Sequence, residues 1–492
     1  MSSIHSARNL STSDFSTINR EVSGQREIQG KPSYTVKQAS DVLTRSGARW
    51  LDINGDGWTD VSYRMRDKAS VLFNAYGLKG FSPLGTAAQD GATAAMNAWS
   101  DVAKVRFTQA PPGGTEEGNI AFSQFTTNDG TYEGVAMTSG LASASSQRYV
   151  ALNPKVPREG MTSDVFLDGL DPANTAPTGP NGGLRTYLHE VGHTLGLSHP
   201  HEPHPEGSSY QTASYAQDSV GYSVMSYWGE HHTGQNFNKN GVSHSASGPM
   251  VDDVAAIQKL YGPNTETRNG DTTYGFNATA DRQDYRLNSA SDAPVFTVWD
   301  GGGVDTLDFS GFADNQQINL NPVQPSNVGG MRGNVFIAKG VAIENAKGGT
   351  GHDIFIPNRV ANVMTGGGGN NTYRYLSFKH STPEKPDRIT DFVSGKDKID
   401  VSEMHRRVMK TAAGNSNEGS PEPSSAVVGP VKLVKQFSGR RNEAVLHYDS
   451  ATKQARLEID VKGRGNAGFL LLIDSNTPLK PTDIVLARPV TR

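Results

Sequence analysis

Three histidines and one glutamate between positions 189 and 199 have the spacing of a catalytic zinc site. In an α-helix, residues four apart share a face, so His189 and His193 can bind one metal ion while Glu190 points at a water molecule on that ion. Gly196 can adopt a positive φ at the helix end, which lets the chain turn back and deliver His199 as third ligand. Three protein ligands leave the fourth tetrahedral position open, as in catalytic rather than structural zinc sites.

A methionine downstream of the histidines adds a second signal. The run YSVMSYWGE begins at Tyr222, and its Met225 is expected to form an apolar floor under the three imidazoles, with Tyr227 facing the metal. The pattern HExxHxxGxxH with a later Met turn is the metzincin protease signature. HExxH alone has only three fixed letters and can arise by chance; the added glycine, third histidine and Met turn argue against that alternative.

The composition excludes several other classes of protein. The 492 residues include 46 basic and 50 acidic side chains, a net charge of −4, which gives no basic footprint for nucleic acid. Cysteine is absent, which excludes a disulfide scaffold and a thiol protease. No stretch approaches the ~20 apolar residues of a membrane span, and positions 1–24 lack the apolar run of a general secretory signal. These features alone would indicate a cytosolic protein.

The sequence pattern changes at Pro263. Before it, the periodicity predicts a mixed α/β unit with helices over 87–105, 185–195 and 250–260 and a strand over 118–125. After it, glycine clusters separate short strands, with strand-like runs at 444–447, 455–461 and 468–473. The stretch 414–430 is rich in Ser, Pro, Gly and Asn and predicts a surface loop.

Two glycine clusters fit or approach the nonapeptide GGxGxDxUx, which builds a calcium-bound parallel β-roll. The copy at 348–356 fits, the copy at 366–373 has Asn371 in place of the aspartate, and a third at 300–307 is divergent. Asparagine keeps an oxygen but loses the charge that gives calcium affinity, so we expect this half-turn to bind calcium weakly or not at all. Ordinary glycine-rich hairpins are the alternative interpretation.

Together these segments resemble the serralysins, bacterial metzincins with an amino-terminal zinc protease domain and a carboxy-terminal calcium β-roll. The likeness spans roughly 33–486. Besides the zinc segment, the stretches that carry it are 33–36, 98–103, 225–230, 250–258, 274–276 and 391–395. It implies an α+β fold: a metzincin protease domain followed by an all-β parallel β-roll or sandwich, shortened because about two nonapeptides are missing after Tyr373. The expected domains are a propeptide or flexible leader (1–30), the zinc metalloprotease domain (31–263), the calcium-binding roll (264–400) and a C-terminal β region with a secretion signal (401–492).

The resemblance implies roles for single residues. One zinc ion would be bound by His189, His193 and His199, with Tyr227 as an additional ligand that moves off during turnover and Glu190 as general base. The implied calcium ligands are the carbonyls of Arg268 and Gly270, with Thr272, Asp300, Gly302 and Asp305; a neighbouring ion near Gly303, Asp305, Ala342 and Glu344; and Gly349, Gly351 and Asp353 in the roll. The strand over 118–125 resembles the cleft-edge strand of the family, so an extended substrate would pair with Asn119, Ile120, Ala121 and Phe122.

These implications predict a secreted zinc endopeptidase of broad specificity, made as a zymogen and acting as a monomer, with several structural calcium ions. Its expected partners are protein substrates, a small protein inhibitor and a type I exporter, with no nucleic acid and no membrane. The exporter would read an uncleaved signal that positions 482–486 resemble, although six residues follow it. Two rival hypotheses are a binding module that has lost catalysis and a zinc hydrolase with a non-peptide substrate.

Other residues mimic metal ligands. His201, His204, His231 and His232 lack motif spacing and are expected at the surface or rim. The run beginning at Asp52 copies the start of an EF-hand calcium loop, but Tyr63 stands at the twelfth position, where a bidentate glutamate is needed. A plain turn is the favoured interpretation.

Overall fold

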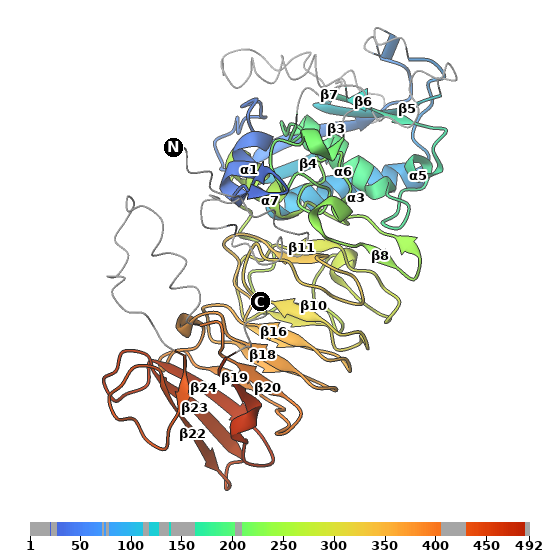
Figure 1. Cartoon of the computed structure of the whole chain (residues 1–492). Helices are drawn as coiled ribbons and strands as arrows, with labels where there is room; N and C mark the ends of the chain where they lie inside the picture. Colours follow the sequence, from blue (N-terminus) through green and yellow to red (C-terminus); the bar gives the residue numbers. More distant parts are fainter. Residues whose placement is uncertain are drawn as a thin grey trace, which may run out of the picture. The chain divides into compact units, whose positions relative to one another are not determined.

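The chain divides into two compact units in the computed structural model (Figure 1). The structure describes residues 20, 27–70, 73–74, 78–111, 118–126, 137–138, 163–201, 209–404 and 430–487. The first unit extends to Thr267 and also contains Val295–Gly301 and Met331–Lys339. These two later segments carry the parallel strands β11 (Phe296–Val298) and β14 (Val335–Ile337). The first unit therefore includes residues that were predicted to belong to the roll. The predicted loop over 414–430 lies outside the described residues except for its last position.

A five-stranded sheet forms the base of the first unit, in the order β4-β3-β5-β7-β6. Its strands are β3 (Thr59–Met65), β4 (Val105–Gln109), β5 (Ile120–Phe125), β6 (Met137–Thr138) and β7 (Ser163–Asp168). All pairings are parallel except that of β6 with β7. Every residue of β5 is buried, as expected for a central strand that neighbours cover on both faces.

Two helices pack against each other in this unit, α3 (Thr86–Val102) and α6 (Gly183–Thr194). The small residues of α3 allow close contact, and the indole N–H of Trp99 donates to the carbonyl of Leu188 on α6 at 3.1 Å. A second pair is α1 (Val36–Leu43) with α7 (Val251–Tyr261), which ends at Gly262. The three predicted helices are therefore confirmed with shifts of a few residues. Shorter elements are α5 (Pro172–Thr175), β1 (Glu27–Ile28), β2 (Lys31–Pro32), β8 (Asn238–Lys239) and β9 (Val242–Ser243).

The predicted leader, residues 1–30, contributes at least one buried side chain to the first unit. Arg20 is 2% exposed, and its guanidinium pairs with the carboxylate of Asp252, which is fully buried, at 2.9 Å through both nitrogens. Its guanidinium carbon lies 4.8 Å from the ring centroid of Tyr222. Strand β1 also begins inside the predicted leader. Arg20 and β1 thus lie within the predicted leader, and Arg20 packs against the first unit.

The second unit is a parallel β-roll in which strands of two or three residues stack turn upon turn (Figure 1). Strands of one sheet are β10 (Thr273–Gly275), β12 (Thr306–Asp308), β15 (Asn345–Lys347), β17 (Val363–Thr365) and β19 (Asp387–Ile389). Strands of the other are β13 (Gln317–Asn319), β16 (Ile354–Ile356), β18 (Thr372–Arg374), β20 (Lys398–Asp400) and β25 (Ile484–Val485). The middle residue of most strands is apolar and buried, for example Leu307, Phe355 and Ile399, so the core lies between the two sheets.

Antiparallel strands extend the first of these sheets. They are β22 (Glu443–Asp449), β23 (Gln454–Asp460) and β24 (Phe469–Asp474), with β21 (Lys432–Leu433) at the edge. Strand β24 pairs in parallel with β19 and so joins this region to the roll. The three predicted strand runs after position 440 are confirmed, as is the fold class of an α+β protease domain followed by an all-β roll.

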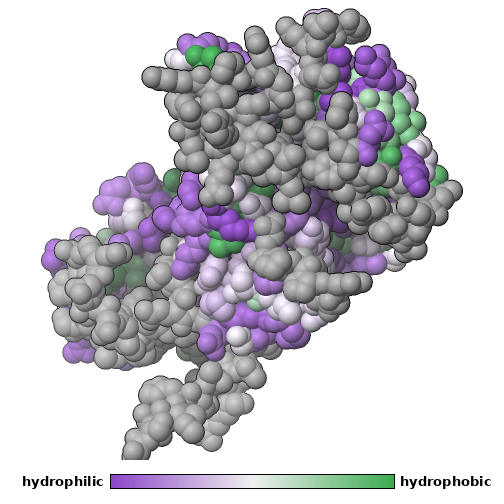
Figure 2. Space-filling model, turned by 90° about the horizontal axis from the view of Figure 1, so that it is seen from above, coloured by the Kyte–Doolittle hydropathy of each residue, from purple (hydrophilic) through white to green (hydrophobic). Residues whose placement is uncertain are grey.

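Exposed large apolar side chains are scattered over the described surface. On the face shown in Figure 2, green apolar residues lie in small groups among purple hydrophilic ones. Within the described parts of the chain, no helix has the length and hydrophobicity needed to cross a bilayer. The large exposed apolar residues are Ile53, Leu170, Tyr227, Val242, Val304, Val363 and Val393.

Candidate metal centre

Helix α6 and the turn that follows it position the three histidines. His189 and His193 lie one helical turn apart on α6, which ends at Thr194. Gly196 has a φ of 99°, and a Cβ there would lie 1.9 Å from the carbonyl oxygen of Ala48, so only glycine fits. The returning chain is held by a hydrogen bond from the N–H of Ser198 to the carbonyl of Leu43 at 2.8 Å.

The three imidazoles meet at their Nε2 atoms. The distances are 3.1 Å between His189 and His193, 3.1 Å between His189 and His199, and 2.8 Å between His193 and His199. Nitrogens about 2.0–2.1 Å from a tetrahedral zinc ion would lie roughly 3.3 Å apart. The structure therefore brings all three predicted histidines to one point with nearly the spacing that zinc requires.

Backbone carbonyls fix which nitrogen of each helical histidine faces this point. Nδ1 of His189 lies 2.8 Å from the carbonyl of Val224, and Nδ1 of His193 lies 2.8 Å from the carbonyl of Leu197. Because a carbonyl accepts only, both Nδ1 atoms carry the proton and both Nε2 atoms present lone pairs to each other. Facing lone pairs repel unless a cation lies between them, so this donor set fits a metal ion.

Electrostatics keep the first ligand in its metal-binding form. Burial, and then the neighbouring His193 and His199, hold the pKa of His189 well below its ordinary value. A neutral imidazole is the form that ligates a metal. Glu190, the next residue on α6, is 5% exposed, so its carboxylate lies in a largely dry environment beside the three histidines.

Met225 lies under α6, where the sequence placed it. It is fully buried, and a Cβ added at Gly192 would lie 2.7 Å from its sulfur, so the thioether packs directly against the helix between the two histidines. Tyr227 is 51% exposed, and its hydroxyl lies 3.4 Å from Nδ1 of His199, the ring nitrogen that faces away from the Nε2 cluster. The phenol therefore stands at the rim of the site.

Asp253 holds the turn that contains Met225, a role that sequence reasoning missed. Its Oδ2 accepts the N–H groups of Val224 at 2.7 Å and Met250 at 2.8 Å, and its Oδ1 accepts the hydroxyl of Ser223 at 2.6 Å. The carbonyl of Val224 in turn orients His189. Asp253 follows Asp252 at the start of α7, where acidic side chains usually favour the helix N-terminus and stay exposed. No sequence pattern therefore indicates that Asp253 points inward.

Replacing Asp253 with alanine is expected to weaken zinc binding about 10–100-fold, because partners that orient a metal ligand contribute this much to affinity. Two buried N–H groups would lose their acceptor, and Val224 would no longer hold the His189 ring. Asparagine retains an oxygen for both N–H groups, so Asp253→Asn should change the affinity only a few-fold. Zinc titration of both variants against a competing chelator measures this; equal affinities would contradict the positioning role.

The predicted substrate strand is wrong. Strand β5 lies between β3 and β7 and pairs with both, so its backbone groups are already used. The side chain of Asn119 also accepts the N–H of Ser62, on the neighbouring strand β3, at 2.8 Å. Ile120, Ala121 and Phe122 are fully buried. The strand at this edge of the sheet is β6, which contacts α6.

Several predicted calcium ligands meet at the start of neighbouring roll strands in the second unit. Oδ1 of Asp305 accepts the N–H of Thr272 at 2.8 Å, and the N–H of Asp305 donates to Glu344 at 2.9 Å. A Cβ on Gly303 would lie 2.7 Å from the carbonyl oxygen of Gly270, so these loops are in contact. Arg268, Gly302 and Ala342 also belong to this unit, whereas Asp300 belongs to the first.

The predicted roll ligands Gly349, Gly351 and Asp353 form one tight turn. Asp353 is buried, and its Oδ2 accepts the N–H of Gly349 at 2.8 Å. A Cβ on Gly351 would lie 2.3 Å from the carbonyl oxygen of Asp314, so the neighbouring loop closes over this turn.

The loop at Asp52 is held by its own groups and by an arginine. Asp52 accepts the N–H groups of Gly55 at 2.8 Å and Gly57 at 2.9 Å. The guanidinium of Arg106 pairs with Asp56 at 2.5 Å and Asp60 at 3.4 Å. Of the four histidines expected at the surface or rim, His201, His231 and His232 are partly or fully exposed, and His204 lies outside the described residues.

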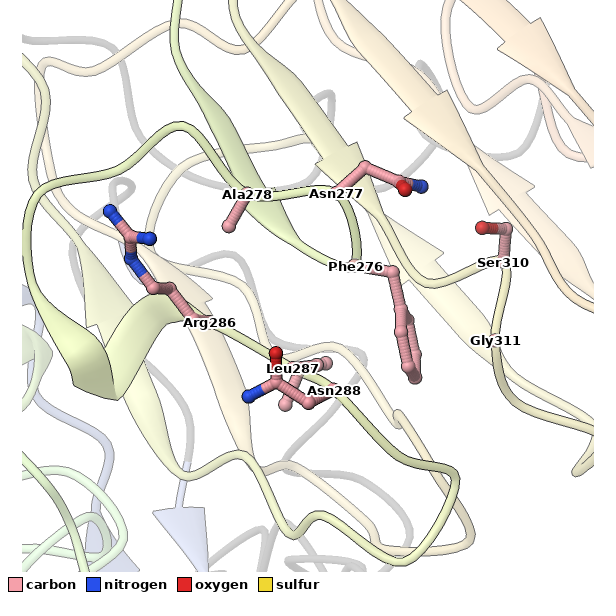
Figure 3. A pocket seen from close by; sticks show the side chains of 8 residues that line it. All are labelled: Phe276, Asn277, Ala278, Arg286, Leu287, Asn288, Ser310 and Gly311. Carbon is pink, nitrogen blue, oxygen red and sulfur yellow. The ribbon is translucent and has the colours of Figure 1, made fainter.

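A pocket of about 520 Å³ lies in the second unit (Figure 3). Its side chains do not converge on one point, and Arg286 is the one ionisable group among them. It therefore lacks acid–base or metal chemistry, and the histidine cluster is the stronger site. The lining residues are Phe276, Asn277, Ala278, Arg286, Leu287, Asn288, Ser310 and Gly311.

Comparison with known proteins gives first the class and then the family. Residues 173–264 match the family model described as Metallo-peptidase family M12B Reprolysin-like, and 263–486 match Peptidase M10 serralysin C terminal. The sequence is 44% identical over 483 residues to the Metalloprotease AprA of Pseudomonas entomophila (strain L48), covering 94% of this chain and 92% of that protein. It is 36% identical over 467 residues to Serralysin C of Dickeya chrysanthemi, covering 91% and 89%. The chain is thus a metallopeptidase, and it belongs to the serralysin family.

Proposed function

We propose that the protein is a secreted endopeptidase with one catalytic zinc ion, bound by His189, His193 and His199. The observation that carries this proposal is the convergence of three Nε2 atoms, two of them fixed as lone-pair donors, beside the buried Glu190. When bound, zinc would polarise the scissile carbonyl and make water acidic enough to be deprotonated near neutral pH.

Glu190 is proposed to move the proton. Its carboxylate accepts a proton from the attacking water and then donates it to the leaving amine, a general acid–base role worth about 10²–10⁴ in rate. Low exposure strengthens the electrostatic interactions of this carboxylate. As the family resemblance implies, Tyr227 is proposed to donate its hydroxyl to the developing oxyanion of the substrate and to act as an additional metal ligand between turnovers. In this structure its hydroxyl lies on the outer side of His199, 3.4 Å from Nδ1, so the phenol would have to move toward the Nε2 cluster for either role.

The substrate is proposed to be an extended polypeptide that adds to the sheet beside β6. This strand ends the sheet, so its outer backbone groups face no further strand among the described residues. Strand addition binds main chain, which supports broad side-chain selectivity. Because the proposed substrate pairs with β6 instead of β5, it would lie next to α6, the helix that carries Glu190.

The second unit is proposed to bind calcium and to carry the export signal. Calcium ions near Asp305 and Asp353 would stabilise the roll. Asp483, within the signal-like segment, is fully buried and accepts the N–H groups of Gly395 at 3.0 Å and Lys480 at 2.8 Å. A type I exporter would therefore have to read this segment before the roll folds. A small protein inhibitor of the cleft, a zymogen form and a monomeric state remain proposals from the family resemblance.

Treatment with a zinc chelator is expected to abolish casein hydrolysis, and added zinc should restore it, because the proposed reaction depends on that ion. Digestion of casein with parallel elemental analysis measures both. A metal-loaded protein that cleaves no polypeptide would favour one of the rivals, a binding module or a hydrolase of other carbonyl compounds. The complete set of three histidines and Glu190 argues against a decayed binding module.

A further inference from the structure

One sheet of the roll carries a ladder of side chains at the start of its strands. In three consecutive turns, the residue before the strand donates its backbone N–H to a side-chain oxygen of the corresponding residue in the next turn. The members are Gln316, Asp353, Asn371 and Asp397, and the three N···O distances along the ladder are 2.8, 3.0 and 2.7 Å. All four are at most 2% exposed, so these bonds are shielded from water.

The two aspartates of the ladder use their second oxygen alike. Oδ2 of Asp353 accepts the N–H of Gly349 at 2.8 Å, and Oδ2 of Asp397 accepts the N–H of Val393 at 2.7 Å. Both donors stand four residues before the aspartate. A carboxylate has about four lone-pair sites, so each can still take a further partner, and its full negative charge suits a calcium ion.

Asn371 uses both of its side-chain atoms in hydrogen bonds. Its Oδ1 accepts the N–H of Asp353, and its Nδ2 donates to the carbonyl of Gly368 at 3.0 Å. The network fixes this orientation, because a flipped amide would set its NH₂ group against the N–H of Asp353. The atom directed into the turn is thus an uncharged donor, which cannot ligate a cation.

A carboxylate from the next turn supplies the acceptor that Asn371 lacks. Asp391, between β19 and β20, accepts the N–H of Gly366 with Oδ1 and the N–H of Gly367 with Oδ2, both at 2.8 Å. Gly367 stands four residues before Asn371, at the position whose N–H the ladder aspartates accept themselves. The backbone groups of the turn at 366–371 are therefore hydrogen-bonded by the Asp391 carboxylate and the Asn371 side-chain amide.

We propose that the turn at 366–371 is a calcium-independent rung of the roll, in which the Asn371 amide and the Asp391 carboxylate replace a bound cation. The residues present do not fit calcium, because the amide presents N–H groups to the turn. The inference rests on the calcium role proposed for the second unit. The turn at 366–371 would therefore stay folded when calcium is scarce. It would also hold the flanking turns in position for calcium binding.

Asn371→Asp is the direct test. In a calcium chelator, the new carboxylate would face the carbonyl of Gly368 without a donor, so the melting temperature should fall by about 2–4 °C. Saturating calcium should reverse the loss and raise the calcium content by one ion per chain. The matched control is Asn321→Asp, which removes an amide that donates to the carbonyl of Pro357 at 2.8 Å, at the other end of the strands. This control should lose stability equally with and without calcium.

One further measurement tests the wild-type turn. Hydrogen exchange of the wild-type protein should show amides 366–371 protected to within about twofold in chelator and in calcium. Loss of that protection in chelator, loss of one calcium ion in Asn371→Ala, or an unchanged calcium count in Asn371→Asp would each overturn the inference. If the wild-type protein binds no calcium at all, the calcium part of the proposed function fails, whereas protection of 366–371 in chelator would still support a cation-free turn.

Discussion

Glu190→Gln is expected to lower kcat for polypeptide cleavage by about 10²–10⁴-fold, the usual contribution of a positioned general base. Glutamine keeps the shape of the side chain but cannot accept the proton of the attacking water. The carboxylate is 5% exposed and follows the metal ligand His189 directly, so no bulk water or second acidic group of the zinc segment can replace it.

The measurement is steady-state peptide hydrolysis with zinc content determined on the same samples. Zinc should remain at one ion per chain, since the three imidazoles are unchanged. The matched control is Glu266→Gln, the same substitution at an exposed residue of the first unit, which should keep wild-type kcat. A zinc-loaded Glu190→Gln variant with more than about a tenth of wild-type kcat would disprove the assigned role.

Arg20→Met is expected to reduce the free energy of unfolding by about 3–5 kcal/mol, the typical cost of leaving one member of a buried ion pair uncompensated. Arg20 and Asp252 are 2% and 0% exposed and contact each other twice at 2.9 Å. The N–H of Asp252 also donates to the carbonyl of Tyr222 at 3.0 Å, next to the residues that Asp253 holds. The lost stability should therefore come with weaker zinc retention.

Urea unfolding of single and double variants tests this coupling. Removing both charges in Arg20→Met with Asp252→Leu should recover most of the loss, because no unpaired ion then remains in the core. A double variant as unstable as the sum of the two single variants would show that the two charges do not act as a pair.

The zinc ligands could be predicted because their geometry is local. His189, Glu190 and His193 lie within one helical turn, and Gly196 needs only a positive φ to bring back His199. The roll could be predicted for a similar reason, since each turn repeats a short pattern with one buried residue per strand.

The substrate strand could not be predicted because its role depends on sheet order. Strand β5 has the composition of a buried strand whether it lies at the edge or in the centre, and only its pairing with β3 and β7 excludes it from the cleft. Asp253 and Arg20 were missed for the same physical reason: their partners are 29–30 and 232 positions away in sequence. Asn371 could be recognised as a departure from the repeat, but not the carboxylate that compensates for it.

The burial of Arg20 limits how far the amino terminus can be trimmed. Cleavage anywhere before this residue leaves the guanidinium attached to the protease domain and Asp252 neutralised. Cleavage just after it would leave the guanidinium on a released peptide, held by noncovalent contacts alone. If that peptide dissociated, the Asp252 carboxylate would remain buried without a counter-ion. If the amino terminus is trimmed as the family resemblance implies, the buried ion pair between Arg20 and Asp252 favours a cut before position 20.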